Sequence, residues 1–423
     1  MTGGSVELNY AKDRNIIDIF IISFIFAFAI RLAACIGYYN INDTFWYRDW
    51  AIGLQSGIFD IYKRADAISL DYPPIYLFFL YITGLFYKVV GIGSHEYIQM
   101  LLMKMWPILG DMVLSLVLFL VIGKENKKAG LAASLLWMFN PAAIFNSSFW
   151  GQTDQLMCLL LFLSFWLLEK DHPLFASALF AVAGMTKFQS LFCVPLFLAE
   201  LFMRYGFKKF MKGIGVAAAS VAAVFIPFMI GSNDPLLFLH VYLKGQGAYP
   251  YYTLNAYNLY GMFGLNGVRD TSENGGLVSP YVLSMVMLAI FVVLIIVFHY
   301  FSKNRSVFVT GYLLLNTIFM FTTRMHERYQ FAALIFLLAA AVVLNYRPFY
   351  YCYAALSFIV FVNHMIPMFM WNSRDSFFEH HQTVYMVVFS ALNLILYFVS
   401  AYYCLKFSTL KADGRKALQD KGR

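Results

Sequence analysis

The chain has 423 residues, of which 61% are hydrophobic and 13% charged, and its formal net charge is +8. An ordinary soluble domain is about 45–50% apolar and about 25% charged, so this composition excludes a soluble multidomain protein, a disordered chain and a fibrous repeat. It also excludes nucleic-acid binding through a basic face, because the basic residues of a membrane protein serve first to orient it. A chain this apolar is typical of helices solvated by lipid.

Twelve apolar stretches are long enough, or nearly so, to cross a bilayer, which takes about 20 residues. We therefore predict one all-α, polytopic membrane domain over residues 1–423 with about 12 transmembrane helices. The stretches 174–186 and 188–203 could form either one kinked helix or two half-helices. In chain order the twelve stretches are 15–37, 100–122, 130–148, 154–168, 174–186, 188–203, 213–231, 280–301, 306–323, 330–345, 349–368 and 384–405.

A further apolar stretch, 75–92, is predicted not to cross the membrane. With the N-terminus in the cytoplasm, 19 of the 31 Lys and Arg residues fall on the cytoplasmic side, and a crossing at 75–92 would invert every later loop. We therefore predict an interfacial or re-entrant helix there, after an amphipathic helix at 44–57, both within a first outer loop at 40–99. A second outer loop covers 232–279, and a basic cytoplasmic tail covers 406–423.

The N-terminus and the cysteines carry little further signal. The first 15 residues lack the layout of a signal peptide, so the first apolar stretch is expected to remain as a span. The five cysteines lie in or beside apolar stretches without metal-ligand spacing, and we expect them to pack as small hydrophobic residues. No cofactor or metal is expected, because the acids form no DxD-type pair. The sequence does not exclude that a divalent cation binds.

Ionisable residues at the ends of membrane spans are costly, and they indicate functional sites. In the predicted topology, acids, amides, a histidine and basic residues gather at the outer ends of the spans, whereas the inner ends carry mainly basic residues. This asymmetry predicts an active site at the outer membrane surface. The outer set comprises Asp43, Asp49, Asp71, Lys104, Gln152, Asp154, Lys187, Gln189, Asn255, Arg324, His326, Glu327 and Arg328.

Each motif in the outer set also has a purely structural interpretation. Asp43 and Asp49, in NDTFWYRDW, suit a general base or a helix cap. Asp71 stands before two prolines and suits ligand binding or turn formation. Gln152 and Asp154, in FWGQTDQL, are typical of sugar binding or of a polar turn between helices.

The most specific motif is TTRMHERYQF, at 322–331. Arg324, His326 and Arg328 are typical ligands of a phosphate, which arginine binds through bidentate, charge-assisted hydrogen bonds. The alternative is an internal salt-bridge network with Glu327. Lys187, between two short apolar stretches, suits an anion contact or a snorkelling lysine. No role is assigned to three buried-looking polar residues, Arg31, Asp111 and His364.

Taken together, these motifs resemble the GT-C integral-membrane glycosyltransferases, most closely the bacterial polytopic members and more distantly the dolichyl-phosphate-glucose-dependent glucosyltransferases. The resemblance rests on Asp43 with Trp50 seven residues later, DYPP before an apolar stretch, WGQTD between two spans, and MHERY late in the chain. It implies an inverting hexosyltransferase of the bacterial plasma membrane. The donor would be a polyprenyl-phosphate-linked monosaccharide, and the acceptor a hydroxyl of a glycan or lipid-linked glycan at the extracytoplasmic face.

The resemblance also implies roles for individual residues. It selects Asp43 over Asp49 as the general base. The implied donor-phosphate ligands are His326, Arg328, Lys187 and Arg324, and the implied substrate contacts are Asp71, Gln152, Asp154, Glu327, Lys104 and Asn255. A secondary transporter or flippase for a lipid-linked sugar is the alternative function, and a ligase that transfers a whole glycan is a third. Transporters usually bind near the bilayer midplane between internal repeats, and no repeat is visible in this sequence.

Overall fold

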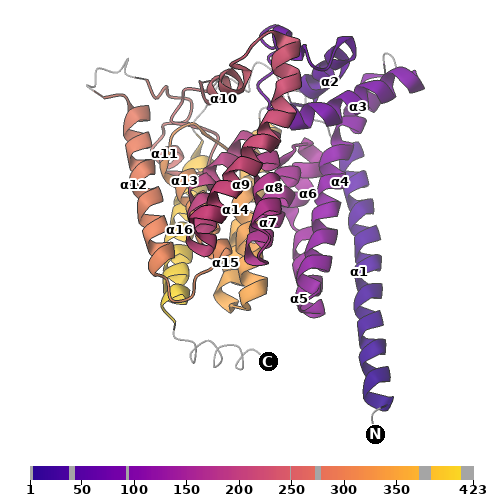
Figure 1. Ribbon diagram of the computed structural model, residues 1–423, viewed down its shortest axis with the longest axis vertical. Coiled ribbons are helices and arrows are strands. Elements are labelled where there is room, and N and C mark those ends of the chain that lie inside the picture. Colours follow the sequence, from indigo (N-terminus) through magenta and orange to yellow (C-terminus); the bar gives the residue numbers. More distant parts are fainter. Residues whose placement is uncertain are drawn as a thin grey trace.

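The computed structural model describes residues 3–37, 43–91, 95–247, 249–271, 278–370 and 383–410. Within these ranges the chain is all-α except for one pair of two-residue strands and a few single bridges. The helices α2 (Asp43–Gly53), α3 (Pro74–Val90) and α10 (Leu237–Gly247) gather at one end of the molecule (Figure 1). The first residues of α1 and the last residues of α16 lie toward the opposite end (Figure 1).

Six helical segments of the described chain are long and apolar enough to cross a membrane. A seventh is added if one bent pair counts as a single span, in which α5 (Lys127–Met138) is followed at an angle of 52° by α6 (Pro141–Ile144) and the π-helix η3 (Phe145–Trp150). This chain is therefore an integral, multi-pass membrane protein. The six long segments include α1 (Gly3–Gly37), α4 (Glu96–Gly123), α9 (Val194–Ser232) with the 3-10 helix η4 (Phe188–Cys193), α12 (Pro280–Phe301), α15 (Arg347–Met370) and α16 (Val384–Thr409).

The predicted count of about twelve spans is thus supported only in part. Several of the predicted stretches form helices shorter than the usual span: α7 (Asp154–Glu169), α8 (Pro173–Thr186), α13 (Val307–Phe321) and α14 (Phe331–Leu344). Two others, 188–203 and 213–231, lie in one continuous segment that is broken at Gly206, where φ is 70° and ψ is 175°. Hydropathy locates apolar helices, but it does not show where a helix bends.

The centre of the molecule is formed by α13 and α14, almost all of whose residues are buried. Gly311 permits their close approach, since a β-carbon there would lie 2.4 Å from the Phe336 ring. Around this centre, α1, α12 and α16 expose rows of large aliphatic side chains. Exposed apolar surface of this kind is expected where helices face lipid.

A buried polar network joins α1 to the helices beside it. Arg31 donates through Nε to Oδ2 of Asp111 at 2.7 Å, and both side chains are fully buried. The Trp137 indole donates to Oδ1 of the same carboxylate at 2.6 Å, and the Ser147 hydroxyl donates to Oδ2 at 3.0 Å. These contacts place Arg31 and Asp111 in a structural link between α1, α4, α5 and η3.

The loop at 232–279 contains structure that the sequence did not predict. Besides α10, it holds the short helix α11 (Leu259–Met262) and the strand β1 (Thr253–Leu254). This strand pairs in parallel with β2 (Met325–His326), so that Thr253 lies opposite Met325 and Leu254 opposite His326. The pairing holds the loop against the MHERY segment.

Candidate active site

The N-terminal residue of α2, Asp43, receives two short hydrogen bonds from the turn between η3 and α7. The Trp150 indole Nε1 and the Gln152 amide Nε2 each donate to Oδ2 of Asp43 at 2.6 Å. Trp150 and Gln152 are buried, whereas Asp43 is partly exposed. The carboxylate predicted as the general base is therefore held by two buried donors and remains accessible.

The turn that supplies these donors is built around Asn146 and Gly151. The backbone amides of Gly151 and Gln152 both donate to the carbonyl of Asn146, at 3.1 and 3.0 Å. Gly151 has a φ of 80°, which a residue with a β-carbon rarely adopts. A β-carbon there would also lie 2.9 Å from Cγ of Lys104. This explains locally why a glycine separates Trp150 from Gln152.

Lys187 lies on the other side of Gln152. Its ammonium forms a buried ion pair with Oδ1 of Asp154 at 2.5 Å and donates to Oε1 of Gln152 at 3.2 Å. The Asn146 amide donates to the second oxygen of Asp154 at 3.0 Å. The structure thus brings the predicted residues Gln152, Asp154 and Lys187 together, and it shows that the charge of Lys187 is already balanced by Asp154.

The MHERY segment brings a second cation to the same region. Arg328 donates through Nη1 to Oε1 of buried Glu327 at 2.8 Å, and its guanidinium lies 5.7 Å from the centre of the Trp150 ring. Among the described residues, Nε of Arg328 and Oε2 of Glu327 have no hydrogen-bond partner. Although burial opposes the charge, Asp43 and Glu327 raise the pKa of Arg328 well above its ordinary value. Arg328 is therefore cationic, and part of its hydrogen-bonding capacity is unused.

Asp71 and Tyr72 complete the polar region from the loop before α3. Burial raises the pKa of Asp71 to about 6, while nearby Arg328 lowers it and Asp43 raises it. The Tyr72 hydroxyl lies 2.8 Å from that of Tyr47, which donates in turn to Gln152 at 3.2 Å. The loop is thus tied through tyrosines to the turn that holds Asp43.

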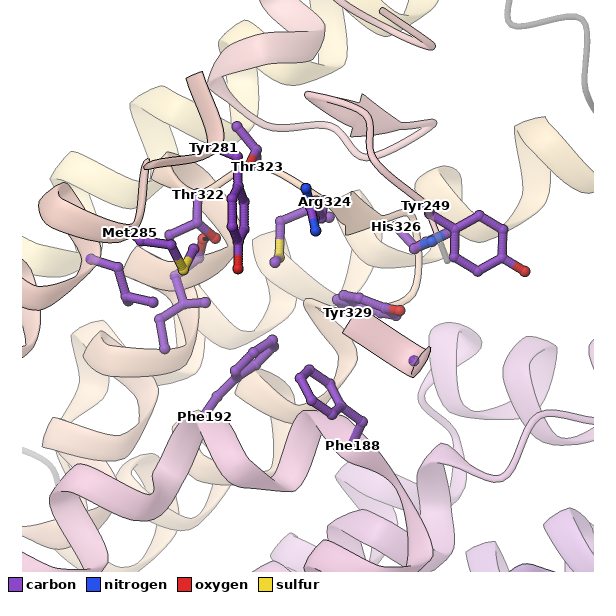
Figure 2. A pocket seen from close by; sticks show the side chains of 14 residues that line it. Phe188, Phe192, Tyr249, Tyr281, Met285, Thr322, Thr323, Arg324, His326 and Tyr329 are labelled. Atoms are coloured by element: carbon purple, nitrogen blue, oxygen red, sulfur yellow. Dashed lines mark hydrogen bonds between the residues drawn. The ribbon is translucent and has the colours of Figure 1, made fainter. Parts of the chain in front are cut away.

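Two neighbouring cavities open beside these groups. The smaller cavity is mixed in polarity and is lined by Asp71, Lys187, Gln189 and Arg328 together with aromatic residues. The larger cavity, of about 230 Å³, is mostly apolar; Phe188 and Phe192 lie on one wall, across from Arg324 and His326 (Figure 2). The two cavities share part of their lining, namely Phe188, Gly245, Tyr249 and Tyr329. A ligand with a charged head and an apolar tail would fit such a pair.

Two of the predicted phosphate ligands line the larger cavity in different ways. The ring of His326 packs against Tyr249 and Tyr329, with ring centres 4.7 and 5.0 Å apart. Arg324 instead forms a two-point ion pair with Asp270, at 2.9 and 3.2 Å, and its guanidinium lies 3.7 Å from the centre of the Tyr281 ring. Arg324 therefore already has an acidic partner within the protein.

Five of the six predicted substrate contacts line neither cavity, namely Gln152, Asp154, Glu327, Lys104 and Asn255. Lys104 and Asn255 also lie apart from the charged groups described above. Lys104 is fully buried behind Gly151, and its ammonium donates to the Cys35 carbonyl at 3.5 Å. Asn255 exchanges hydrogen bonds with Asn266, at 2.8 and 3.0 Å, and bridges to His326 beside the strand pair. Both placements favour a structural role over a contact with substrate.

Two side chains of the candidate site were not predicted from the sequence. Trp150 stands in the FWGQTDQL motif, but an indole beside polar residues gave no sign that it would reach a carboxylate 107 positions away. Asp270, the partner of Arg324, lies in a loop without any recognisable motif. Within the described part of the chain, no three His, Cys, Asp or Glu residues are close enough together to hold a metal ion.

The fold and the site define a multi-pass membrane protein with a buried, mixed-charge site at one end of its helices. The model of glycosyltransferase family 87 matches residues 70–324, more than half of the chain. The chain belongs to glycosyltransferase family 87 and is a membrane glycosyltransferase. The match includes Asp71, Gln152 and Lys187, while Asp43 and Arg328 lie outside it.

Similarity to individual proteins is more distant. No curated protein matches the chain. Among solved structures, the crystal structure of ArnT from Cupriavidus metallidurans bound to undecaprenyl phosphate is similar, with a TM-score of 0.39 and 12% sequence identity. The alignment covers 96% of this chain and 77% of the ArnT chain.

Proposed function

We propose that this glycosyltransferase transfers a monosaccharide from a polyprenyl-phosphate-linked donor to an acceptor hydroxyl, with inversion at the anomeric carbon. The acceptor is a glycan or a lipid-linked glycan. The chain crosses the membrane about twelve times, with both termini in the cytoplasm and the site at the extracytoplasmic face. The distribution of Lys and Arg between the loops supports this orientation.

One arrangement carries the proposal. The partly exposed carboxylate of Asp43 is linked through Gln152 to Lys187 and through Trp150 to Arg328. These two cations line a small polar cavity, which shares four lining residues with the larger apolar one. A base, cationic groups for a leaving phosphate and an apolar space for a lipid are the three features that this reaction requires.

In the proposed reaction, Asp43 accepts the proton of the acceptor hydroxyl as its oxygen attacks the anomeric carbon. The bond between that carbon and the phosphate oxygen breaks, and the lipid phosphate leaves with the electron pair. Arg328 is already cationic and stabilises the charge that develops on the leaving group, with His326 and Lys187 nearby. A phosphate leaves readily as an anion, so no general acid is needed.

The apolar cavity gives the lipid part of the donor a place to bind. Its walls include Phe188 and Phe192 from η4, Met285 and Leu288 from α12, and Ile318 from α13. Binding energy from a part of the substrate that does not react can be used to hold the reacting groups in position. The arrangement therefore suits a donor on a long apolar carrier better than a soluble sugar nucleotide.

The direct test measures transfer of radiolabelled sugar by the purified protein from synthetic polyprenyl-phosphate sugars to candidate acceptors. We expect the wild type to transfer and Asp43→Asn to lose about 10²–10⁴ of the rate, which is the usual contribution of a general base. Asp49→Asn is the matched control, because Asp49 lies on the same helix but is exposed and pairs with Arg48.

Two outcomes would overturn the proposal. Normal transfer by Asp43→Asn at saturating substrate would remove the base from the mechanism. Uptake of a lipid-linked sugar into sealed vesicles without any glycosyl transfer would favour the flippase. The orientation has its own test, since impermeant cysteine labelling should find residues introduced at 124–128 protected from outside the cell.

A further inference from the structure

Trp150 and Gln152 both contact one oxygen of the proposed base, Asp43, and each also contacts one of the two cations. Both donate to Oδ2 of Asp43 at 2.6 Å. Hydrogen bonds to a carboxylate at this distance are short and directional. Two donors that reach one oxygen from different side chains fix both the position and the plane of the carboxylate.

Beyond Asp43, each donor reaches one cation. The other end of the Gln152 amide, Oε1, accepts from Lys187 at 3.2 Å. The ring of Trp150 lies 5.7 Å below the guanidinium of Arg328, within the range of a cation–π contact. Gln152 therefore links Asp43 to Lys187, and Trp150 links Asp43 to Arg328, so that one residue lies between the proposed base and each cation proposed to stabilise the leaving phosphate.

The backbone that carries the two residues has little freedom. Trp150 is the last residue of the π-helix η3. Such helices are rare in proteins, and those that do occur are often found at functional sites. The following glycine has a φ of 80°, and the Asn146 carbonyl accepts from both amides after Trp150. From behind, the Trp150 ring meets the buried His364 edge-on, with ring centres 5.6 Å apart.

We propose that Trp150 and Gln152 are positioning residues that hold Asp43 at a set distance and orientation relative to Arg328 and Lys187. This inference rests on the proposed function, because it gives the base its geometry. Neither residue needs to touch the reacting atoms. A misplacement of about 1 Å can cost about 10²-fold in rate, so loosening the carboxylate should lower kcat while leaving the donor site nearly unchanged.

The test compares kcat and KM of Trp150→Phe and Gln152→Met with those of the wild type. Each substitution keeps most of the side-chain volume and removes the donor to Asp43. We expect kcat to fall by about 10–100-fold, with the KM for a polyprenyl-phosphate sugar changed by less than about threefold. If Trp150→Phe does not fold, Gln152→Met by itself still tests whether loss of a donor to Asp43 lowers kcat.

Trp137→Phe is the matched control. The Trp137 indole also donates to a carboxylate at 2.6 Å, but that carboxylate is Asp111, away from both cavities. We expect this variant to lower the unfolding temperature and to keep the kcat of the folded protein. A fall in kcat equal to that of Trp150→Phe would mean that any loss of a buried indole bond has this effect, and it would overturn the positioning role.

A second measurement separates positioning from direct contact with substrate. In an Asp43→Ala background, the substitution Trp150→Phe should leave the residual rate unchanged, because it keeps a ring near Arg328 and the carboxylate that the indole positions is gone. A further fall in that background would contradict the proposal. If the wild type transfers no sugar from any polyprenyl-phosphate donor, the proposed function fails; if it transfers and kcat is unchanged in both single variants, only the positioning role fails.

Discussion

Two arginine–carboxylate pairs in this protein, Arg31–Asp111 and Arg328–Glu327, each have a buried carboxylate, and they differ in how fully that carboxylate is hydrogen-bonded. Both oxygens of Asp111 accept hydrogen bonds, and Arg31 also donates to two backbone carbonyls at 2.9 and 3.1 Å, although its Nη2 has no partner within the described chain. In the second pair, Oε2 of Glu327 and Nε of Arg328 have no hydrogen bond within the described chain. Arg328 lines the smaller of the two cavities described above, whereas neither Arg31 nor Asp111 lines either of them.

The comparison shows that a buried charge alone does not identify a binding site. A pair whose buried carboxylate is fully hydrogen-bonded fixes the helices that it joins, and removing one partner is costly. A buried pair with unused polar atoms beside a cavity is poised to bind a ligand, because unsatisfied buried groups are rare in native proteins. The following predictions test this distinction, from the largest expected effect to the smallest.

Asp111→Ala should be strongly destabilising, because it leaves the buried charge of Arg31 without its partner. We expect a loss of about 3–5 kcal/mol in the free energy of unfolding, measured as a lower unfolding temperature in detergent. The matched control is Asp13→Ala, which breaks the exposed pair of Asp13 with Lys127 and should cost less than about 1 kcal/mol. Equal losses in the two variants would contradict the structural role of the Arg31 pair.

Arg328→Lys should act on catalysis more than on stability. The lysine keeps a charge beside Glu327 but loses the planar donors that match a phosphate. We expect kcat/KM to fall by about 10²-fold with little change in unfolding temperature, measured in the sugar-transfer assay and by thermal unfolding. A stability loss with unchanged kcat/KM would place this pair in the same category as Arg31–Asp111.

Asp71→Asn should change how stability depends on pH. The folded protein raises the pKa of Asp71 to about 6 from an ordinary value of 3.8, so it binds this proton more tightly than the unfolded chain does. Stability is therefore lost as the pH rises from about 4 to about 6. The asparagine variant should unfold at a higher temperature than the wild type at pH 8, and the difference should vanish near pH 4.

Asp66→Asn is the control for this pH effect. A hydrogen bond from Lys244 lowers the pKa of the Asp66 carboxyl in the folded protein, so the sign is reversed. Replacing Asp66 should not raise the unfolding temperature at pH 8. A rise equal to that of Asp71→Asn would show that net charge, and not the burial of Asp71, sets the pH dependence.

Arg324→Lys should have the smallest effect on the reaction. Arg324 lines the larger cavity, but Asp270 and the Tyr281 ring already engage its guanidinium. We expect kcat/KM to change by less than about tenfold, well below the effect of Arg328→Lys. Losses of equal size at the two arginines would show that the ion pair with Asp270 opens when the donor binds.

Part of the candidate site can be predicted from local sequence motifs, and part cannot. The mixed-charge motifs at the ends of apolar stretches predicted that Asp43, Gln152, Lys187 and Arg328 belong to one site. The structure joins the first three by hydrogen bonds and places Arg328 over the neighbouring Trp150 ring, and of the four Lys187 and Arg328 line the smaller cavity. Lys104 was grouped with them for the same reason, yet it packs behind Gly151. An end of a helix can be recognised in a sequence, but the direction in which its side chain points cannot.

The sequence by itself determined that this is a helical membrane protein and predicted a set of acids, amides and basic residues at one end of its spans, because hydropathy and charge are properties of consecutive residues. Tertiary structure alone decided which charges neutralise one another. Asp154 balances Lys187 and Asp270 balances Arg324, while Trp150 reaches Asp43 across 107 positions. Such pairs depend on how helices distant in the chain rotate and pack, and no local pattern records that.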